Sequence, residues 1–305
     1  MPYLSFLFIC LVWGSSFILV DRAADALGPV TIGMCRLLGG ALVLGLYWAF
    51  LSRRSEQITA RDIKHILVVA AMANAWPFVV LPYVMAQADQ HAYFGMMVAL
   101  VPLVTILATV PMLGIWPTTR QLVGVLGGLI CMAGVVLDGS QRGIPLSVLV
   151  LGLTVPLTYG LGNTYIKWKL DHLHPLPLTV LFLGAGGLML FPLWCWPGAQ
   201  DAAGIGSPAH PHDWPMAILS ISLLAIVGTG VTILIFIHLV KSQGPLFAGM
   251  ATYVIPIVAL AWGQFDDEKL TSLQLAAMGG VLAMVALVQW GAADPKHQLP
   301  DPLLD

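Results

Sequence analysis

Charged side chains are scarce in this sequence. Asp, Glu, Lys and Arg make up 9% of the 305 residues, whereas an ordinary soluble domain carries about 25%. So few charges cannot cover a water-exposed surface, and this excludes a soluble globular protein. The 13 basic residues are offset by 15 acidic ones, so the chain also lacks the basic surface that nucleic-acid binding requires.

Catalytic and metal-binding patterns are also missing. The four cysteines lie within apolar stretches, without the spacing of metal ligands. The sequence contains no H-E-x-x-H or G-x-S-x-G motif, and no Asp or Glu falls near the centre of an apolar stretch. We therefore expect no metal site and no cofactor, and a membrane-embedded enzyme is a less favoured alternative.

Long apolar runs are what the sequence has in abundance, since 58% of its residues are hydrophobic. A bilayer core about 30 Å thick is crossed by about 20 helical residues. We predict an all-α integral membrane protein with ten transmembrane helices. The predicted spans lie near residues 3–21, 29–50, 64–85, 92–113, 119–137, 144–168, 175–196, 215–240, 245–264 and 271–292.

The basic residues predict the orientation of these spans. With a cytoplasmic N-terminus, nine basic residues fall on the cytoplasmic side, and only Arg22, Arg142 and Lys269 fall outside. This asymmetry fits the positive-inside rule. We therefore expect both termini in the cytoplasm, with a disordered cytoplasmic tail over residues 294–305.

The second half of the chain repeats the pattern of the first. A shift of 154 residues carries Gly95 onto Gly249 and Pro102 onto Pro256. Such matches occur in order along the chain with a nearly constant offset, which indicates an internal duplication.

The duplication predicts two five-helix units, residues 1–142 and 143–293. Because five is an odd number, the second unit enters the membrane from the opposite side to the first. The fold class is then two inverted five-helix repeats, an architecture typical of secondary transporters. A duplicated scaffold or sensor stays an alternative.

Several motifs resemble a known family. They are Trp13-Gly14-Ser15-Ser16-Phe17, Pro102, Lys241-Ser242-Gln243-Gly244-Pro245, Tyr253, Pro256, Glu268-Lys269-Leu270, Gln274 and Gly280. The chain is similar over nearly its whole length to the EamA-type drug/metabolite transporter superfamily, and within it to bacterial exporters of amino acids, aromatic ones included. The resemblance implies a multi-pass protein of the bacterial inner membrane. The first half departs from the family pattern, because Ile115-Trp116-Pro117 stands where an acidic residue like Glu268 is expected.

Proline and glycine recur near the membrane centre when residues are counted inward at about 1.5 Å each. A broken helical turn in hydrocarbon is tolerated where it is buried in protein or faces a wet cavity. We therefore predict a central cavity with helix joints, and ordinary helix packing is the alternative. The predicted joints are Gly14, Pro77, Pro102, Pro156 and Pro256.

Aromatic and neutral polar residues share this depth. Aromatic walls stack on apolar ligands and attract ammonium groups, and amides and hydroxyls orient a zwitterion. Helix packing is the alternative role for each residue. The predicted substrate-binding residues are Trp13, Ser16, Phe17, Asn74, Trp76, Tyr159, Asn163 and Tyr253.

Two ionisable residues lie within predicted spans. Arg36 lies about 10 Å below the outer end of its helix, where its guanidinium either binds a substrate carboxylate or anchors the bundle. His238 is the candidate for a proton relay, although a solvated side chain is the favoured interpretation. Since no carboxylate is central, we favour uncoupled transport over obligate proton antiport.

Together these features predict a secondary transporter that exports small metabolites by alternating access. Amino acids, including aromatic and large apolar ones, are the expected substrates. A multidrug or nucleotide-sugar carrier is the alternative, although one arginine is too few for a diphosphate. The expected partners are the small-molecule substrate and the lipid bilayer.

Overall fold

The computed structural model describes residues 2–51, 58–88, 94–95, 97–141, 143–208, 212–265 and 271–289. Within these ranges all regular secondary structure is helical, as predicted from the sequence. The predicted tail over residues 294–305 and the family position Glu268 lie outside the described residues.

The first half of the chain begins with two long helices and continues with interrupted ones. Its elements are α1 (Pro2–Ala24), α2 (Pro29–Leu51), α3 (Ala60–Val69), η1 (Ala70–Ala75), α4 (Trp76–Ala88), η2 (Val98–Leu100), α6 (Val101–Leu113) and α7 (Thr119–Gln141).

The second half has the same sequence of long and interrupted helices, with a short additional helix, α10, in the loop after α9. Its elements are α8 (Leu146–Lys169), α9 (Pro175–Trp194), α10 (Pro197–Ala202), α11 (Trp214–Leu223), η3 (Leu224–Val231), α12 (Thr232–Gln243), α13 (Pro245–Gly249), α14 (Ala251–Phe265) and α15 (Ser272–Gln289).

These helices have the length and composition of a membrane protein. Among the described residues, seven helical stretches are long and apolar enough to cross a bilayer, and three shorter apolar helices accompany them. The described helix ends agree with the predicted spans to within about four residues, except in the fourth span, which is predicted from residue 92 and whose first described element, η2, begins at Val98. An all-helical membrane fold is confirmed, whereas the number of crossings and their inverted arrangement stay predictions.

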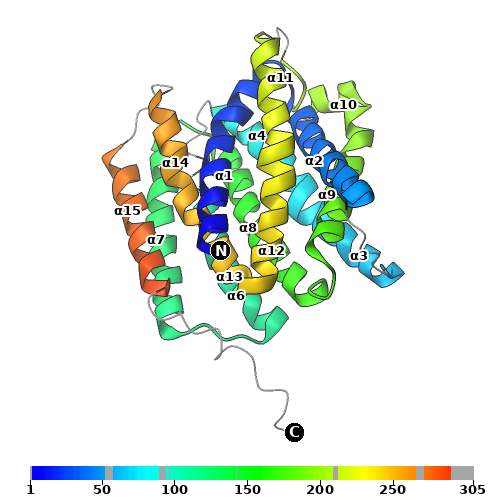
Figure 1. Ribbon diagram of the computed structural model, residues 1–305. Helices are drawn as coiled ribbons and strands as arrows, with labels where there is room; N and C mark the ends of the chain where they lie inside the picture. The colour runs from blue at the N-terminus through cyan, green and yellow to red at the C-terminus, as the bar shows by residue number, and fades with distance from the viewer. Residues whose placement is uncertain are drawn as a thin grey trace.

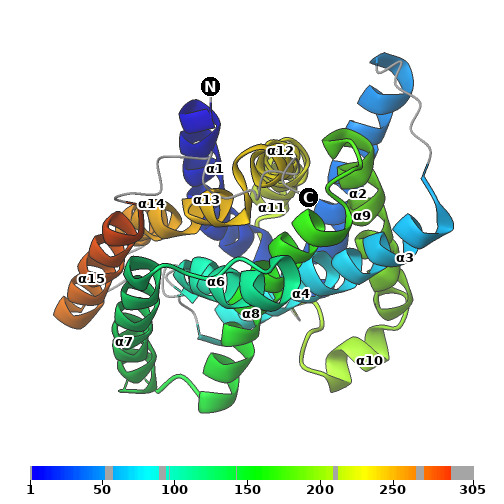
Figure 2. The ribbon, with the colours of Figure 1, turned by 90° about the horizontal axis from the view of Figure 1, so that it is seen from below.

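The helices stand roughly side by side in one bundle (Figure 1). The continuous rod of α11, η3 and α12 lies beside α1 at the centre, and α2 packs along α9. Figures 1 and 2 agree that α7 and α15 form a pair at one edge. The buried apolar side chains fall into two clusters, one around α6 and α14 and the other around α2 and α9.

Two helices each contain a π-helical segment near the middle, η1 and η3. A π turn disrupts the regular α-helical hydrogen-bond ladder, and such turns occur mostly at functional sites. Side chains donate to carbonyls five residues earlier in both places, Asn74 Nδ2 to Val69 O at 3.3 Å and Thr232 Oγ1 to Val227 O at 2.7 Å. These side chains help to satisfy the backbone polar groups of the wider turns.

Glycines let helices of the two halves approach each other closely. A Cβ atom added at Gly14 of α1 would lie 2.7 Å from Val258 Cγ1 of α14. A Cβ atom added at Gly160 of α8 would lie 2.7 Å from Val104 Cγ1 of α6. Each contact therefore requires a glycine, and each joins one half of the chain to the other.

The π segments are covered by glycines in a similar way. A Cβ atom added at Gly39 of α2 would lie 2.8 Å from Ala225 Cβ of η3, and one at Gly186 of α9 would lie 3.3 Å from Ala70 O of η1. The second helix of each half thus packs on the π segment of the other half.

One end of the bundle is held by a lysine at the end of α12. Lys241 Nζ donates to the carbonyl oxygens of Leu170 at 2.5 Å, Asp171 at 2.7 Å and Leu173 at 2.6 Å. These carbonyls lie just after the C-terminus of α8, where a positive charge is favoured by the helix dipole. Lys167 Nζ in turn contacts Lys241 O at 2.9 Å and Asp171 Oδ2 at 2.8 Å.

Candidate functional site

A cavity lies inside the bundle where α1, α2, η1, α4, α8 and α12 meet. It contains about 950 Å³ of space that no atom fills, counting the part that opens to the exterior. Small-molecule sites typically occupy about 300–1,000 Å³. The lining residues are Trp13, Ser16, Phe17, Val20, Arg36, Val69, Ala73, Asn74, Pro77, Phe78, Leu81, Val98, Val101, Tyr159, Asn163, Ile166, Phe182, Ile233, Phe236, Ile237, Thr252 and Ile255.

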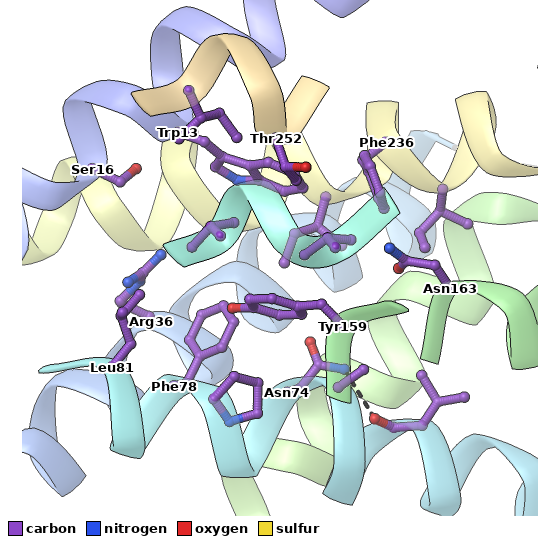
Figure 3. A pocket seen from close by; sticks show the side chains of 18 of the residues that line it. Trp13, Ser16, Arg36, Asn74, Phe78, Leu81, Tyr159, Asn163, Phe236 and Thr252 are labelled. Atoms are coloured by element: carbon purple, nitrogen blue, oxygen red, sulfur yellow. Dashed lines mark hydrogen bonds between the residues drawn. The ribbon is translucent and has the colours of Figure 1, made fainter. Parts of the chain in front are cut away.

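Aromatic rings form much of this lining (Figure 3). The rings of Trp13 and Phe236 have centroids 4.9 Å apart and are inclined by 51°. Trp13 Nε1 donates to Gly228 O at 2.9 Å, so its indole is tied to the π segment η3. The Tyr159 ring crosses the cavity with its hydroxyl directed toward Phe78. Apolar and aromatic ligands are suited to such walls.

Neutral polar groups reach the cavity from several helices. Asn163 of α8 has no hydrogen bond to another described residue, and Figure 3 shows its amide at the cavity. The amide of Asn74 keeps its oxygen directed toward Tyr159 while its nitrogen binds Val69 O. The Ser16 hydroxyl donates to Val12 O of its own helix at 2.9 Å, and the Thr252 hydroxyl donates to Gly249 O at the end of α13 at 2.6 Å. The Asn163 amide is therefore the polar group most available to a ligand.

Arg36 is the one cation in this lining, and its side chain belongs to α2. It is 7% exposed, its guanidinium carbon lies 4.5 Å from the centroid of the Phe78 ring, and its Nε donates to Thr229 Oγ1 at 3.3 Å. Among the described residues, no Asp or Glu lines the cavity. The site thus combines aromatic walls, two amides and a single buried positive charge.

The structure places most of the predicted binding residues at one cavity. Trp13, Ser16, Phe17, Asn74, Tyr159 and Asn163 all line it. Their roles in substrate binding stay predictions, but these six residues from three helices do converge.

Trp76, a predicted substrate-binding residue, does not line this cavity. Its side chain is 45% exposed on the outside of the bundle, where Nε1 donates to Thr154 Oγ1 at 2.9 Å. The π segment η1 ends at Ala75 and sets the helical phase so that Asn74 and Pro77 face the cavity. Trp76 then points to the outside.

Tyr253 also lies away from the cavity lining. It is 4% exposed and belongs to the apolar cluster around α6 and α14. The break between α13 and α14 at Met250 sets the phase of α14, so Thr252 and Ile255, three residues apart, face the cavity instead. Tyr253 is therefore absent from the residues that line this cavity, and its role in substrate binding stays a prediction.

The predicted helix joints have different local structures. Pro77 lines the cavity directly after η1, and Pro102 follows the 3₁₀ turn η2 at the start of α6. Pro156 and Pro256 are buried inside α8 and α14. Gly14 permits the close packing of α1 on α14. Movement at these positions stays a prediction.

His238 is not at the cavity. Its side chain is exposed on α12, although its neighbour Ile237 lines the cavity. The helical step of about 100° between neighbouring residues explains why one faces inward and the other outward. The predicted possible proton role of His238 therefore has no support from its position.

Sequence reasoning missed three phenylalanines of the lining, Phe78, Phe182 and Phe236. They belong to helices that are apolar on all sides, so hydrophobic periodicity does not indicate which face meets the cavity. A weak signal existed for Phe78, since it adjoins the predicted joint Pro77.

A bundle of apolar helices around a cavity lined mainly by aliphatic and aromatic side chains is the arrangement of a polytopic membrane transporter. The sequence profile described as the EamA-like transporter family matches residues 1–137 and again residues 146–290. The chain therefore belongs to the EamA-like transporter family, within the drug/metabolite transporter superfamily, and is a membrane transporter. The predicted family resemblance is confirmed.

Individual relatives are distant. The chain is 23% identical over 286 residues to the uncharacterized inner membrane transporter YedA of Escherichia coli (strain K12), covering 92% of this chain and 88% of that protein. It is 20% identical over 276 residues to the uncharacterized transporter YoaV of Bacillus subtilis (strain 168), covering 88% and 90%. A solved crystal structure of a protein superposes with a TM-score of 0.67 at 14% identity, covering 96% of this chain and 98% of that chain. That likeness concerns the fold alone.

Proposed function

We propose that this transporter exports small metabolites through the central cavity, namely zwitterionic amino acids, including those with aromatic and large apolar side chains. The observation that carries the proposal is the lining itself. Rings of Trp13, Tyr159 and Phe236 offer apolar and quadrupolar contacts, while the Asn74 and Asn163 amides offer hydrogen bonds. This lining therefore favours a ligand with an apolar side chain and no more than one carboxylate, which Arg36 can pair.

We further propose that the two halves are inverted repeats that exchange access by rocking about the cavity. Two features support this architecture. The family profile matches each half separately, and the contact of Gly14 in the first half with Val258 in the second corresponds to the contact of Gly160 in the second half with Val104 in the first. Inverted repeats with a site near the membrane midplane are common among secondary transporters. The proposal includes ten crossings in the inner membrane with both termini in the cytoplasm.

Flux down a concentration gradient is proposed to be uncoupled from protons. Proton-coupled carriers commonly place a carboxylate or histidine along the substrate pathway. Neither group is found among the described residues that line the cavity, and His238 faces away from it.

Other substrate classes fit the cavity less well. A nucleotide sugar carries a diphosphate that calls for several cationic contacts, and the lining offers Arg36 alone. A neutral or cationic drug fits the aromatic walls but leaves Arg36 without a partner. A membrane enzyme would need convergent catalytic groups, and the lining has amides and hydroxyls without an acidic or imidazole partner.

Counterflow in proteoliposomes of the purified protein tests the proposal. We expect labelled phenylalanine or leucine to exchange at equal pH on both sides, and to be displaced by other large apolar amino acids. Exchange of nucleotide sugars without exchange of amino acids would overturn the substrate class. Exchange only under an imposed pH gradient would overturn the uncoupled mechanism, and substrate turnover without flux would indicate an enzyme.

A further inference from the structure

We infer that Arg36 is the receptor for a substrate carboxylate, and that the cavity selects apolar monocarboxylates whether or not they carry an α-amino group. The inference rests on the proposed role of the cavity as the substrate site, and it deepens that role by naming the group that is recognised. It does not depend on amino acids being the physiological substrates.

The first argument is the donor capacity of the guanidinium. An arginine side chain carries five N–H donors in a planar fork that matches a carboxylate. In the part of the chain that the structure describes, one hydrogen bond engages them, from Nε to Thr229 Oγ1 at 3.3 Å. One face of the fork rests on the Phe78 ring at 4.5 Å. Donors at the Nη atoms are therefore left for a ligand in the cavity.

The second argument is charge. Arg36 is 7% exposed, and no carboxylate among the described residues forms an ion pair with it. An isolated buried charge is costly, whereas the same charge paired through well-aligned hydrogen bonds is tolerated. Within the cavity, a ligand carboxylate would supply the missing negative charge. A ligand whose group next to Arg36 is neutral or cationic would leave the guanidinium without a negative partner.

The third argument is that Arg36 is not part of the duplicated scaffold. The offset of 147 residues that carries Gly39 onto Gly186 carries Arg36 onto Leu183, which is fully buried among apolar side chains. The glycine that packs on a π segment recurs in both halves, but the cation does not. A scaffold role shared by the two halves would require similar residues at both positions. Arg36 instead places a positive charge on one side of the cavity only.

The position of the cation predicts how a ligand lies. With its carboxylate on Arg36, the remainder of the molecule extends along Tyr159 toward Asn163 and Phe236 (Figure 3). Ring faces and amide oxygens receive an ammonium group there, but no carboxylate does. The α-amino group thus finds neutral partners only, and removing it costs little affinity.

Three ligands that differ in a single group test this inference on the unmodified protein. They are 3-phenylpropionate, its neutral isostere 3-phenylpropanamide, and the carboxylate-free amine 2-phenylethylamine, with binding followed by calorimetry on the purified transporter. We expect the acid to bind at least tenfold more tightly than the amide or the amine, and phenylalanine to bind within about threefold of the acid. Equal binding of acid and amide, or preference for the amine, would overturn the inference.

Variants of the receptor sharpen the test. In Arg36→Gln the preference for the acid over the amide should fall below threefold, whereas Arg36→Lys should keep part of it because the charge remains without the planar fork. Binding of the neutral amide reports whether Arg36→Gln is folded, since the amide makes no use of the charge. A tenfold acid preference that survives in folded Arg36→Gln would place the carboxylate elsewhere and refute the assignment.

The outcomes separate this inference from the proposed function. If the acid binds selectively through Arg36 while no amino acid exchanges in counterflow, the amino-acid proposal fails and the carboxylate receptor stands. If phenylalanine exchanges but the acid binds no better than the amide, the transport proposal stands and the receptor is refuted.

Discussion

Replacing Lys241 by Met removes the ammonium that joins the end of α12 to the turn between α8 and α9. In the structure Nζ donates to three carbonyl oxygens within 2.7 Å, and these belong to Leu170, Asp171 and Leu173. Met keeps a side chain of similar length and its apolar contacts. The substitution therefore isolates the charged hydrogen bonds from packing.

The expected loss of unfolding free energy is smaller than the sum for three independent hydrogen bonds. A hydrogen bond to a charged group contributes about 1.5–3 kcal/mol net, but here one ammonium is shared among three carbonyls that are partly open to water. Water molecules can hydrogen-bond to these carbonyls in the variant, so we expect the free energy of unfolding to fall by about 2 kcal/mol in total. For a domain of about 150–250 residues, somewhat smaller than this chain, a loss of 1 kcal/mol in unfolding free energy lowers Tm by about 2–4 °C. Lys241→Met should therefore unfold about 4–8 °C below the unmodified protein.

Thermal unfolding in detergent measures this shift, and Lys169→Met is the matched control. Lys169 Nζ lies 3.5 Å from the centroid of the Trp168 ring, and an exposed contact of this kind contributes about 0.5–1 kcal/mol. The melting temperature of the control should fall by about 1–4 °C by the same conversion. A loss in Lys241→Met no larger than in Lys169→Met would show that the three hydrogen bonds add nothing that water does not supply.

Three further predictions concern the cavity, the packing and the topology. Trp13→Ala should reduce flux per molecule severalfold because it removes a cavity wall, whereas Trp76→Ala should stay within twofold; equal losses in the two variants would contradict the assignment of the wall. Gly14→Ala should destabilise the protein by about 1–3 kcal/mol through overpacking against Val258, whereas Gly279→Ala, which meets no atom within 4 Å, should change little in the same unfolding assay. A periplasmic reporter fused at either terminus should be inactive, and clear activity there would reverse the proposed orientation.

The sequence predicts the helices well because apolar length is a direct requirement of the bilayer. The predicted ends lie close to those of the described helices, even where a π segment interrupts the rod. Depth in the membrane is equally accessible, since it follows from counting residues at about 1.5 Å each. Trp13, Asn74 and Tyr159, which this count places at a similar depth, all line the cavity, and their part in substrate binding stays a prediction.

The sequence predicts less well which side of each helix faces the cavity. A helix that is apolar all round carries no periodicity to set its rotation, and one irregular turn moves every later residue. Trp76 lies outside and Pro77 inside because of η1, and Thr252 replaces Tyr253 at the cavity because of the break before α14. These irregular turns depend on contacts between the two halves, which a single span does not reveal.

The close contact at Gly14 has a consequence for the order in which the protein is made. Its partner Val258 is 244 residues further along the chain, so at about 5–20 residues per second the ribosome needs about 12 to 50 seconds to reach it. Gly160, by contrast, emerges after its partner Val104 is already present. The first helix therefore enters the bilayer long before the surface it will cover exists. Among the described helices, only α15 is made later than α14, and it packs mainly on α7.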